Sequence, residues 1–259
     1  MNFVLNAAGL NFSATSAAGA SDAALGDLPV WKLQDLYPSA ISTAFTSDME
    51  KAGKNSIAFE EKWKGKLAAA ATKTGAEGIG QALKEYEALD DIIGRLGSFA
   101  GLTYFSDTTS PVNGKLYGDV QARITEFSGH LLFFALELNR IDDAVMDACM
   151  ANDPAAGHYR PWLVDLRKDK PYQLDDKLEQ LFLEKSMTSA AAFNRLFDET
   201  MAELRYEIDG EKLPLEVALN MLQDPNPEAR HKAAMALAAT FKANIRTFTL
   251  ITNTLAKDK

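Results

Sequence analysis

The segment L-L-F-F-A-L-E-L-N-R-I-D-D, residues 131–143, carries the clearest structural signal in the chain. Apolar residues recur through it at steps of three and four, and the same period extends from Leu116 to Val145. Such a period places apolar side chains along one face of an α-helix. Leu132 and Phe133 add apolar surface on a second side. We therefore expect one long helix whose middle is buried all round, in the centre of a multi-helix domain.

Further periodic segments on both sides of this helix predict an all-α fold. They cover residues 59–70, 79–100, 178–182, 193–204, 215–222 and 237–255. Gly94, Gly97 and Gly101 lower helix propensity, so we expect them to let a neighbouring helix approach closely. A single strand-like stretch, residues 205–213, has Asp209-Gly210 at its centre. Asp-Gly accepts the positive φ angles of a type I′ turn, which predicts one short β-hairpin.

Polar residues at the starts of the periodic segments predict helix N-caps. Asn226 can cap a helix whose first position is Pro227, and Ser47 has capping-box spacing with the glutamate three residues later. The adjacent acids at 142–143 and 175–176 point about 100° apart on a helix, so neither pair can easily clamp one metal ion. We expect these acids on solvated faces or at N-caps, with capping favoured at 175–176.

Composition indicates a globular protein and argues against nucleic-acid binding. The chain has 259 residues, 47% of them hydrophobic, which is enough to form a sizeable core. Lys and Arg number 27 against 36 Asp and Glu, and the resulting net charge of −9 repels phosphate backbones. No apolar run is long enough to span a membrane. We therefore expect neither nucleic acid nor membrane as a partner.

The lone cysteine and the first residues bear on cellular location. Cys149 cannot form an internal disulfide, and its apolar helical setting predicts a buried, inert thiol. A reducing compartment follows, so we expect a cytoplasmic protein. Residues 1–27 contain no Lys or Arg and therefore lack the positively charged start of a secretory signal. We interpret them as a disordered or loosely attached tail.

The histidines argue against a zinc site within this chain. A metallopeptidase helix places two histidines four residues apart so that both bind one ion. The three histidines are His130, His158 and His231, and none lies within a helical turn of another. We therefore expect no catalytic residue and no metal ligand in these residues.

One segment concentrates side chains that can bind a ligand. Its six candidates are His158, Tyr159, Arg160, Trp162, Arg167 and Tyr172. On a cleft wall, arginines would hold peptide carbonyls or a terminal carboxylate, and aromatic rings would cover side chains of the peptide. The alternative, which we favour, is an inter-helix connector fixed by its aromatic rings and by pairing with nearby acids.

Four tracts of the sequence resemble a known enzyme family. The tracts are H-Y-R-P-W-L-V-D-L-R-K-D-K-P-Y-Q-L-D-D-K-L at 158–178, F-D-E-T-M-A-E-L-R-Y-E-I-D-G-E at 197–211, the segment 131–143 and W-K-L-Q-D-L-Y-P at 31–38. Together they resemble oligoendopeptidase F, a zinc metallopeptidase similar to thimet oligopeptidase. The resemblance runs from about Trp31 to Lys259.

The resemblance implies that residues 28–259 form the helical N-terminal lobe of a larger, two-lobed peptidase. In that family one lobe walls a deep channel, and the other carries zinc on an H-E-x-x-H helix. The full-length enzyme would then need zinc and would hydrolyse short peptides. This chain holds no such motif, so we expect it to be inactive alone. The alternative is a helical module that binds peptides or proteins without hydrolysis.

The final periodic segment leads to two further expectations. Its apolar stripe consists of Phe241, Ile245, Phe248, Ile251 and Leu255 and continues to the last residues, with no Gly or Pro to end the helix. No later residue can cover this stripe. We therefore expect truncation at the C-terminal end, a missing C-terminal lobe as partner, and possible self-association through an exposed last helix.

Overall fold

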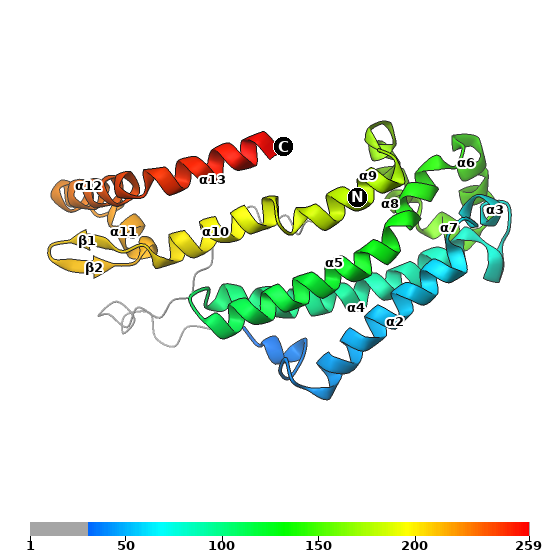
Figure 1. The fold of residues 1–259 in the computed structure, drawn as a ribbon, viewed down its shortest axis with the longest axis horizontal. Coiled ribbons are helices and arrows are strands. Elements are labelled where there is room, and N and C mark those ends of the chain that lie inside the picture. Colours follow the sequence, from blue (N-terminus) through cyan, green and yellow to red (C-terminus); the bar gives the residue numbers. More distant parts are fainter. Residues whose placement is uncertain (1–30, 259) are drawn as a thin grey trace. The chain divides into compact units, whose positions relative to one another are not determined.

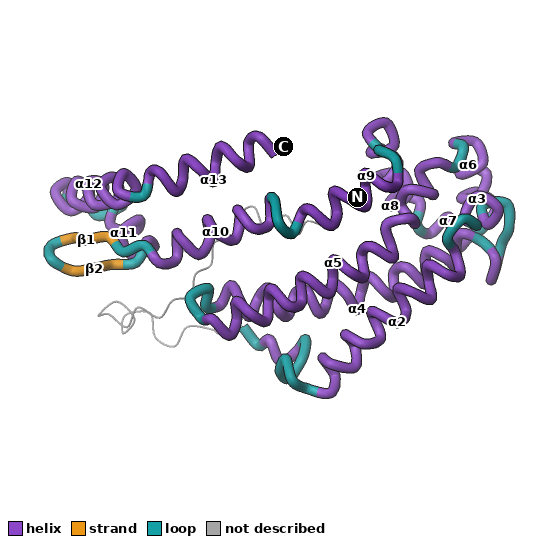
Figure 2. The backbone as a smooth tube through the Cα atoms, in the orientation of Figure 1, coloured by secondary structure: helices purple, strands orange, loops and turns teal. Residues whose placement is uncertain are grey.

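The computed structural model describes residues 31–258, and most of them are helical (Figure 1). Figure 2 shows a single pair of strands among the described residues. The predicted fold class, all-α with one hairpin, is confirmed. The described residues form two compact units: unit 1 comprises 33–101 and 117–185, and unit 2 comprises 31–32, 102–116 and 186–258. The tail predicted at 1–27 lies outside the described residues.

Unit 1 holds the longer helices. Its elements are the 3-10 helix η1 (Leu33–Asp35), α2 (Thr43–Trp63), α3 (Leu67–Ala70), the 3-10 helix η2 (Gly75–Glu77), α4 (Ile79–Ser106), α5 (Pro111–Arg140), α6 (Asp143–Asn152), α7 (Pro154–His158), α8 (Arg160–Leu166), the 3-10 helix η3 (Arg167–Tyr172) and α9 (Asp176–Ser186). The end of α4 and the start of α5 belong to unit 2.

The core of unit 1 forms where α2, α4 and α5 bring aromatic rings together. The rings of Phe59 and Phe134 meet edge to face at 5.2 Å between centroids, and Tyr86 stacks on Phe134 at 4.8 Å. Residues 131–139 are each buried or half-buried. All-round burial is therefore confirmed for this C-terminal part of α5, whereas Arg123 and Glu126 in the middle of the helix are exposed.

Glycines allow two of these helices to pack closely on α5. A Cβ atom at Gly97 of α4 would lie 3.1 Å from Ile124 Cδ1, and one at Gly53 of α2 would lie 3.0 Å from the Phe127 ring. The predicted close approach is thus confirmed at Gly97. At Gly94 it is wrong, because a Cβ there would have no neighbour within 4 Å.

Two predicted helix boundaries are wrong. The long helix stops at Arg140, because Asp142 starts α6 by accepting hydrogen bonds from the backbone N–H groups of Ala144 and Val145. This confirms the capping use of the acids at 142–143. Helix α2 begins five residues before the predicted start, where the Ser42 hydroxyl accepts from Phe45 N. Ser47 lies inside the helix.

Unit 2 contains the hairpin and the last helices. Its elements are α10 (Ala190–Glu203), β1 (Tyr206–Ile208), β2 (Glu211–Leu213), α11 (Leu215–Met221), α12 (Pro227–Ala243) and α13 (Ile245–Asp258). Tyr206 pairs with Leu213 across the hairpin, and the turn residues Asp209 and Gly210 have φ angles of 51° and 86°. The hairpin prediction is confirmed. Asn226 caps α12 as predicted, accepting from Glu228 N.

The last helix differs from its prediction in two ways. It breaks at Asn244 into α12 and α13, and α13 packs against α10. Ile251 of the stripe is therefore buried, with 2% of its surface exposed, and Phe248 meets Phe197 of α10 edge to face. The expectation of a bare stripe is wrong for these residues, although Ile245 remains 58% exposed. No helix within residues 31–258 is long and apolar enough to cross a membrane.

Candidate functional site

The six candidate ligand-binding residues lie on short helices and not on an irregular connector. Asp153 is buried and caps α7 by accepting from Ala155 N, with Pro154 at the helix start. Proline near the start of a helix costs no backbone hydrogen bond, and α8 likewise has Pro161 in its first turn. The candidates thus fall on α7, α8, η3 and the residue between α7 and α8.

Two of the candidates are anchored to the core of unit 1. The Trp162 ring lies 5.9 Å from Tyr86 and 6.5 Å from Phe134, measured between centroids. The Tyr159 hydroxyl donates to Glu87 Oε2 at 2.5 Å. Burial and this carboxylate raise the pKa of Tyr159 to about 12, so its phenol stays protonated and holds α4.

Arg167 closes the C-terminal end of α5. Its guanidinium donates to the carbonyl oxygens of Leu138 at 2.6 Å and Ile141 at 2.7 Å, and it also pairs with Asp143. The last carbonyls of a helix have no partner within the helix, and a basic side chain can supply one. Arg167 and Lys170 together lower the pKa of Asp143 through hydrogen bonds. This geometry gives Arg167 a structural role.

The other three candidates are exposed. His158 and Arg160 lie at the surface around the start of α8, and Tyr172 at the end of η3 is 81% exposed. The His158 ring contacts Tyr159 edge to face at 5.0 Å between centroids. The structure therefore divides the six candidates into anchored and exposed residues, and their contact with a peptide stays a prediction.

The described residues do not fit a zinc ion. Within residues 31–258, no three His, Cys, Asp or Glu side chains are grouped so that they could hold a metal. His130 instead hydrogen-bonds Glu60 through Nδ1 at 2.6 Å, which ties α5 to α2. Cys149 is buried as predicted, and burial raises the pKa of its thiol. We therefore assign no step of metal chemistry to these residues.

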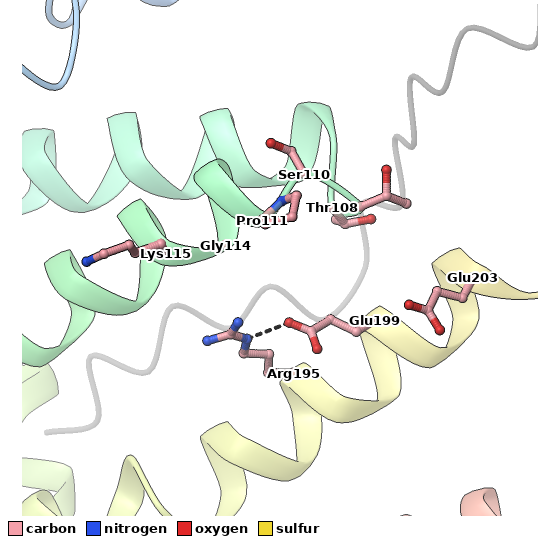
Figure 3. Close-up of a pocket in the computed structure, with 9 residues that line it drawn as sticks. Thr108, Ser110, Pro111, Gly114, Lys115, Arg195, Glu199 and Glu203 are labelled. Carbon is pink, nitrogen blue, oxygen red and sulfur yellow. Dashed lines mark hydrogen bonds and ion pairs between the residues drawn. The ribbon is translucent and has the colours of Figure 1, made fainter.

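Sequence reasoning missed a cavity of about 360 Å³ in unit 2. It is lined by Thr108, Thr109, Ser110, Pro111, Gly114, Lys115, Arg195, Glu199 and Glu203. Figure 3 shows Arg195 and Glu199 projecting from α10 toward the first turns of α5, and Arg195 Nε donates to Glu199 Oε1 at 2.7 Å. The only sequence signal was Ser110-Pro111, which reads as an ordinary helix start and gives no hint of a cavity.

A second, smaller cavity of about 220 Å³ lies between α2 and α5 in unit 1. Its charged side chains are already paired. Arg123 binds Glu126 at 2.8 Å and also lies over the Phe127 ring, while Lys54 contacts Glu50 at 3.5 Å. In the first cavity the Thr109 hydroxyl donates to Asp107 Oδ1 at 2.7 Å and the Ser110 hydroxyl accepts from Asn113 N, both contacts within the segment between α4 and the first turn of α5.

Comparison with known proteins finds similarity to one family model. Residues 137–206 match the family model described as Oligopeptidase F. The resemblance to the N-terminal region of oligoendopeptidase F is confirmed. The tract 158–178 falls wholly within the matched residues, whereas the opening tract 31–38 lies outside them. The search of curated proteins gave no match.

The search of solved structures found one that shares the fold of this chain. The crystal structure of oligoendopeptidase-F from Enterococcus faecium superposes with a TM-score of 0.69 at 16% sequence identity, over 83% of this chain. A putative peptidase from Chlamydophila abortus gives a TM-score of 0.49 at 16% identity, over 86% of this chain. The chain spans 41% of the first structure and 37% of the second. Its fold is therefore that of one part of a larger protein.

Proposed function

We propose that this chain is the N-terminal, channel-forming part of a zinc-dependent oligopeptidase that hydrolyses short peptides. In this proposal, residues outside the chain hold the zinc. The observation that supports it most directly is the family-model match at residues 137–206, because it selects oligopeptidase F by sequence. The fold shared with an oligoendopeptidase-F adds support that does not depend on sequence identity.

The proposed role of this chain is to shape access to a catalytic centre elsewhere. Its long helices, with aromatic rings packed between α2, α4 and α5, give a rigid wall that can exclude folded proteins and admit extended peptides. His158, Arg160 and Tyr172 are the candidates whose side chains are exposed, so we propose them as the peptide contacts. We also propose a cytoplasmic location, because the single cysteine is buried and unpaired.

The test compares this chain with the protein that the native reading frame encodes. Both are purified and incubated with short internally quenched peptides, and zinc content is measured by elemental analysis. We expect the longer protein to bind zinc and to cleave peptides, and the 259-residue chain to do neither. A reading frame without an H-E-x-x-H motif would overturn the proposal. It would favour a helical module that binds peptides or proteins without hydrolysing them.

The proposed peptide contacts need a separate test on the longer enzyme. Replacing Tyr172 with Ala should raise KM for short peptides with little change in kcat, because an exposed contact contributes to binding and not to chemistry. Trp162→Ala is a poor substitute, since Trp162 packs against the core of unit 1 and its loss would also destabilise the unit. Unchanged kinetics for variants at all three exposed positions would remove this segment from the channel wall.

A further inference from the structure

Helix α9 leaves three of its four apolar side chains exposed, and only Leu183 is half-buried. Its polar residues turn toward α5: Asp176 pairs with Arg140, and Gln180 lies 3.2 Å from where a Cβ atom on Gly129 would sit. On a helix of 3.6 residues per turn, Leu178 and Phe182 lie about 160° around the helix axis from Gln180, and Leu181 lies about 100° from it. Leu178, Leu181 and Phe182 are 41%, 47% and 61% exposed.

The same exposure extends beyond this helix. Leu174, just before α9, is 44% exposed, and no residue from 167 to 205 is buried. Yet this stretch lies within residues 137–206, which the family model matches. A surface helix of a monomer normally buries its apolar stripe against its own core. The apolar face of Leu174, Leu178, Leu181 and Phe182, here called the α9 face, is thus left without cover by unit 1.

We propose that the α9 face is the interface between this chain and the remaining residues of a longer polypeptide of the same protein. The inference rests on the proposed function, which supplies the longer polypeptide. The length of the fold relative supports this occupant, since the chain covers only 41% of it. The chemistry of the face, aliphatic and aromatic side chains in a row, fits an apolar helix or loop and not a charged ligand.

A second copy of this chain fits the α9 face less well. The chain carries a net charge of −9, so long-range repulsion opposes the encounter of two copies. A segment of the same polypeptide does not have to approach by diffusion. Covalent linkage gives it a high effective concentration at the α9 face, whatever its charge. A segment of the same polypeptide is therefore the favoured occupant.

Cysteine labelling tests this assignment. Phe182→Cys is introduced into the 259-residue chain and into the protein encoded by the native reading frame, and alkylation at residue 182 is followed by mass spectrometry. Cys149 is buried and serves as an internal slow thiol. We expect labelling at 182 to be about tenfold slower or more in the longer protein, because the contact must open before the thiol reacts. Lys84→Cys, at an exposed position on α4, is the control and should label equally in both proteins.

Each other outcome overturns the inference. Equal labelling at 182 in both proteins would show that the longer polypeptide adds no cover to the α9 face. Protection that appears in the 259-residue chain and grows with its concentration would identify a second copy as the occupant. A native reading frame that stops after Lys259 would leave no occupant. Leu181→Cys, read in the same way, guards against misfolding of the first variant.

The labelling result is independent of the peptidase assay. A longer protein that protects residue 182 but cleaves no peptide would refute the proposed function and keep the interface. A longer protein that cleaves peptides while residue 182 labels freely would support the proposed function and refute the interface. The two proposals can therefore fail separately.

Discussion

At the scale of single residues, Gly80 is the position where one methyl group should matter most. A Cβ atom there would lie 2.5 Å from Ala155 Cβ, 2.6 Å from Asp153 Oδ2 and 2.8 Å from Ala156 N. These are short or backbone groups that cannot move aside. Gly80→Ala should therefore destabilise the protein by about 2 kcal/mol, measured by urea unfolding.

Gly94→Ala is the matched control on the same helix. A Cβ atom at Gly94 would meet nothing within 4 Å. Alanine there should stabilise α4 by about 0.5 to 1 kcal/mol, because it reduces the entropy of the unfolded chain. Equal unfolding midpoints for the two variants would show that α4 and α7 are not packed as closely as described.

Arg167 allows a similar test of a polar contact. Arg167→Met would leave the carbonyls of Leu138 and Ile141 without their partner and should cost about 2 kcal/mol. Arg160→Met, on an exposed arginine seven residues earlier, should change stability by less than about 0.5 kcal/mol. Thermal or urea unfolding measures both. Similar losses for the two variants would contradict the structural role of Arg167.

Asp143, which pairs with Arg167, should make the free energy of unfolding depend on pH. Hydrogen bonds from Arg167 and Lys170 lower the pKa of Asp143, so its carboxylate stabilises the folded state above the ordinary carboxyl pKa of about 4. This stabilisation is lost as pH falls through the lower, folded-state pKa. The difference in unfolding free energy between the unchanged protein and Asp143→Asn should therefore shrink as pH falls from about 7 to about 3. A difference that stays constant with pH would contradict the shift.

At the scale of elements, α13 offers two neighbouring residues with opposite surroundings. Ile251 is 2% exposed against α10, whereas Leu250 is 58% exposed. Ile251→Ala should cost about 2 to 4 kcal/mol, and Leu250→Ala less than about 0.5 kcal/mol. Urea unfolding of unit 2 distinguishes them. Small losses from both variants would restore the expectation that the stripe on the last helix is bare.

Local signals in the sequence predicted the elements better than their ends or their packing. Asp209-Gly210 specified the hairpin and Asn226-Pro227 a helix start, because each depends only on adjacent backbone. The start of α2 at Ser42 was missed, since Ser47 offered equally good capping chemistry. The packing of α10 on α13 could not be predicted from the sequence either. The spacing of apolar residues shows which face of a helix is apolar, but it does not show which element packs on that face.

The candidate site was predicted less well than the fold, for a related reason. Sequence grouped six residues by their chemistry, but the structure uses Arg167 to bind backbone carbonyls and Trp162 to fill a core. Every residue carries a backbone carbonyl, so the type of a residue does not reveal which carbonyl accepts a hydrogen bond from an arginine. The cavity beside Ser110 was missed because its lining comes from segments far apart in sequence.

At the scale of the whole molecule, the distribution of burial predicts where the chain opens first. Leu96 and Leu138, in α4 and α5, are fully buried, whereas α9 buries no side chain. Amide hydrogens exchange through local opening, and opening costs little where few apolar contacts are broken. In the 259-residue chain, α9 should therefore exchange well before the central turns of α4 and α5, as followed by hydrogen-exchange mass spectrometry. In the protein encoded by the native reading frame, α9 should slow while α4 and α5 stay unchanged. If α9 already exchanged as slowly as α5 in the 259-residue chain, its apolar residues would have to be covered within the chain itself, and the α9 face would need no outside partner.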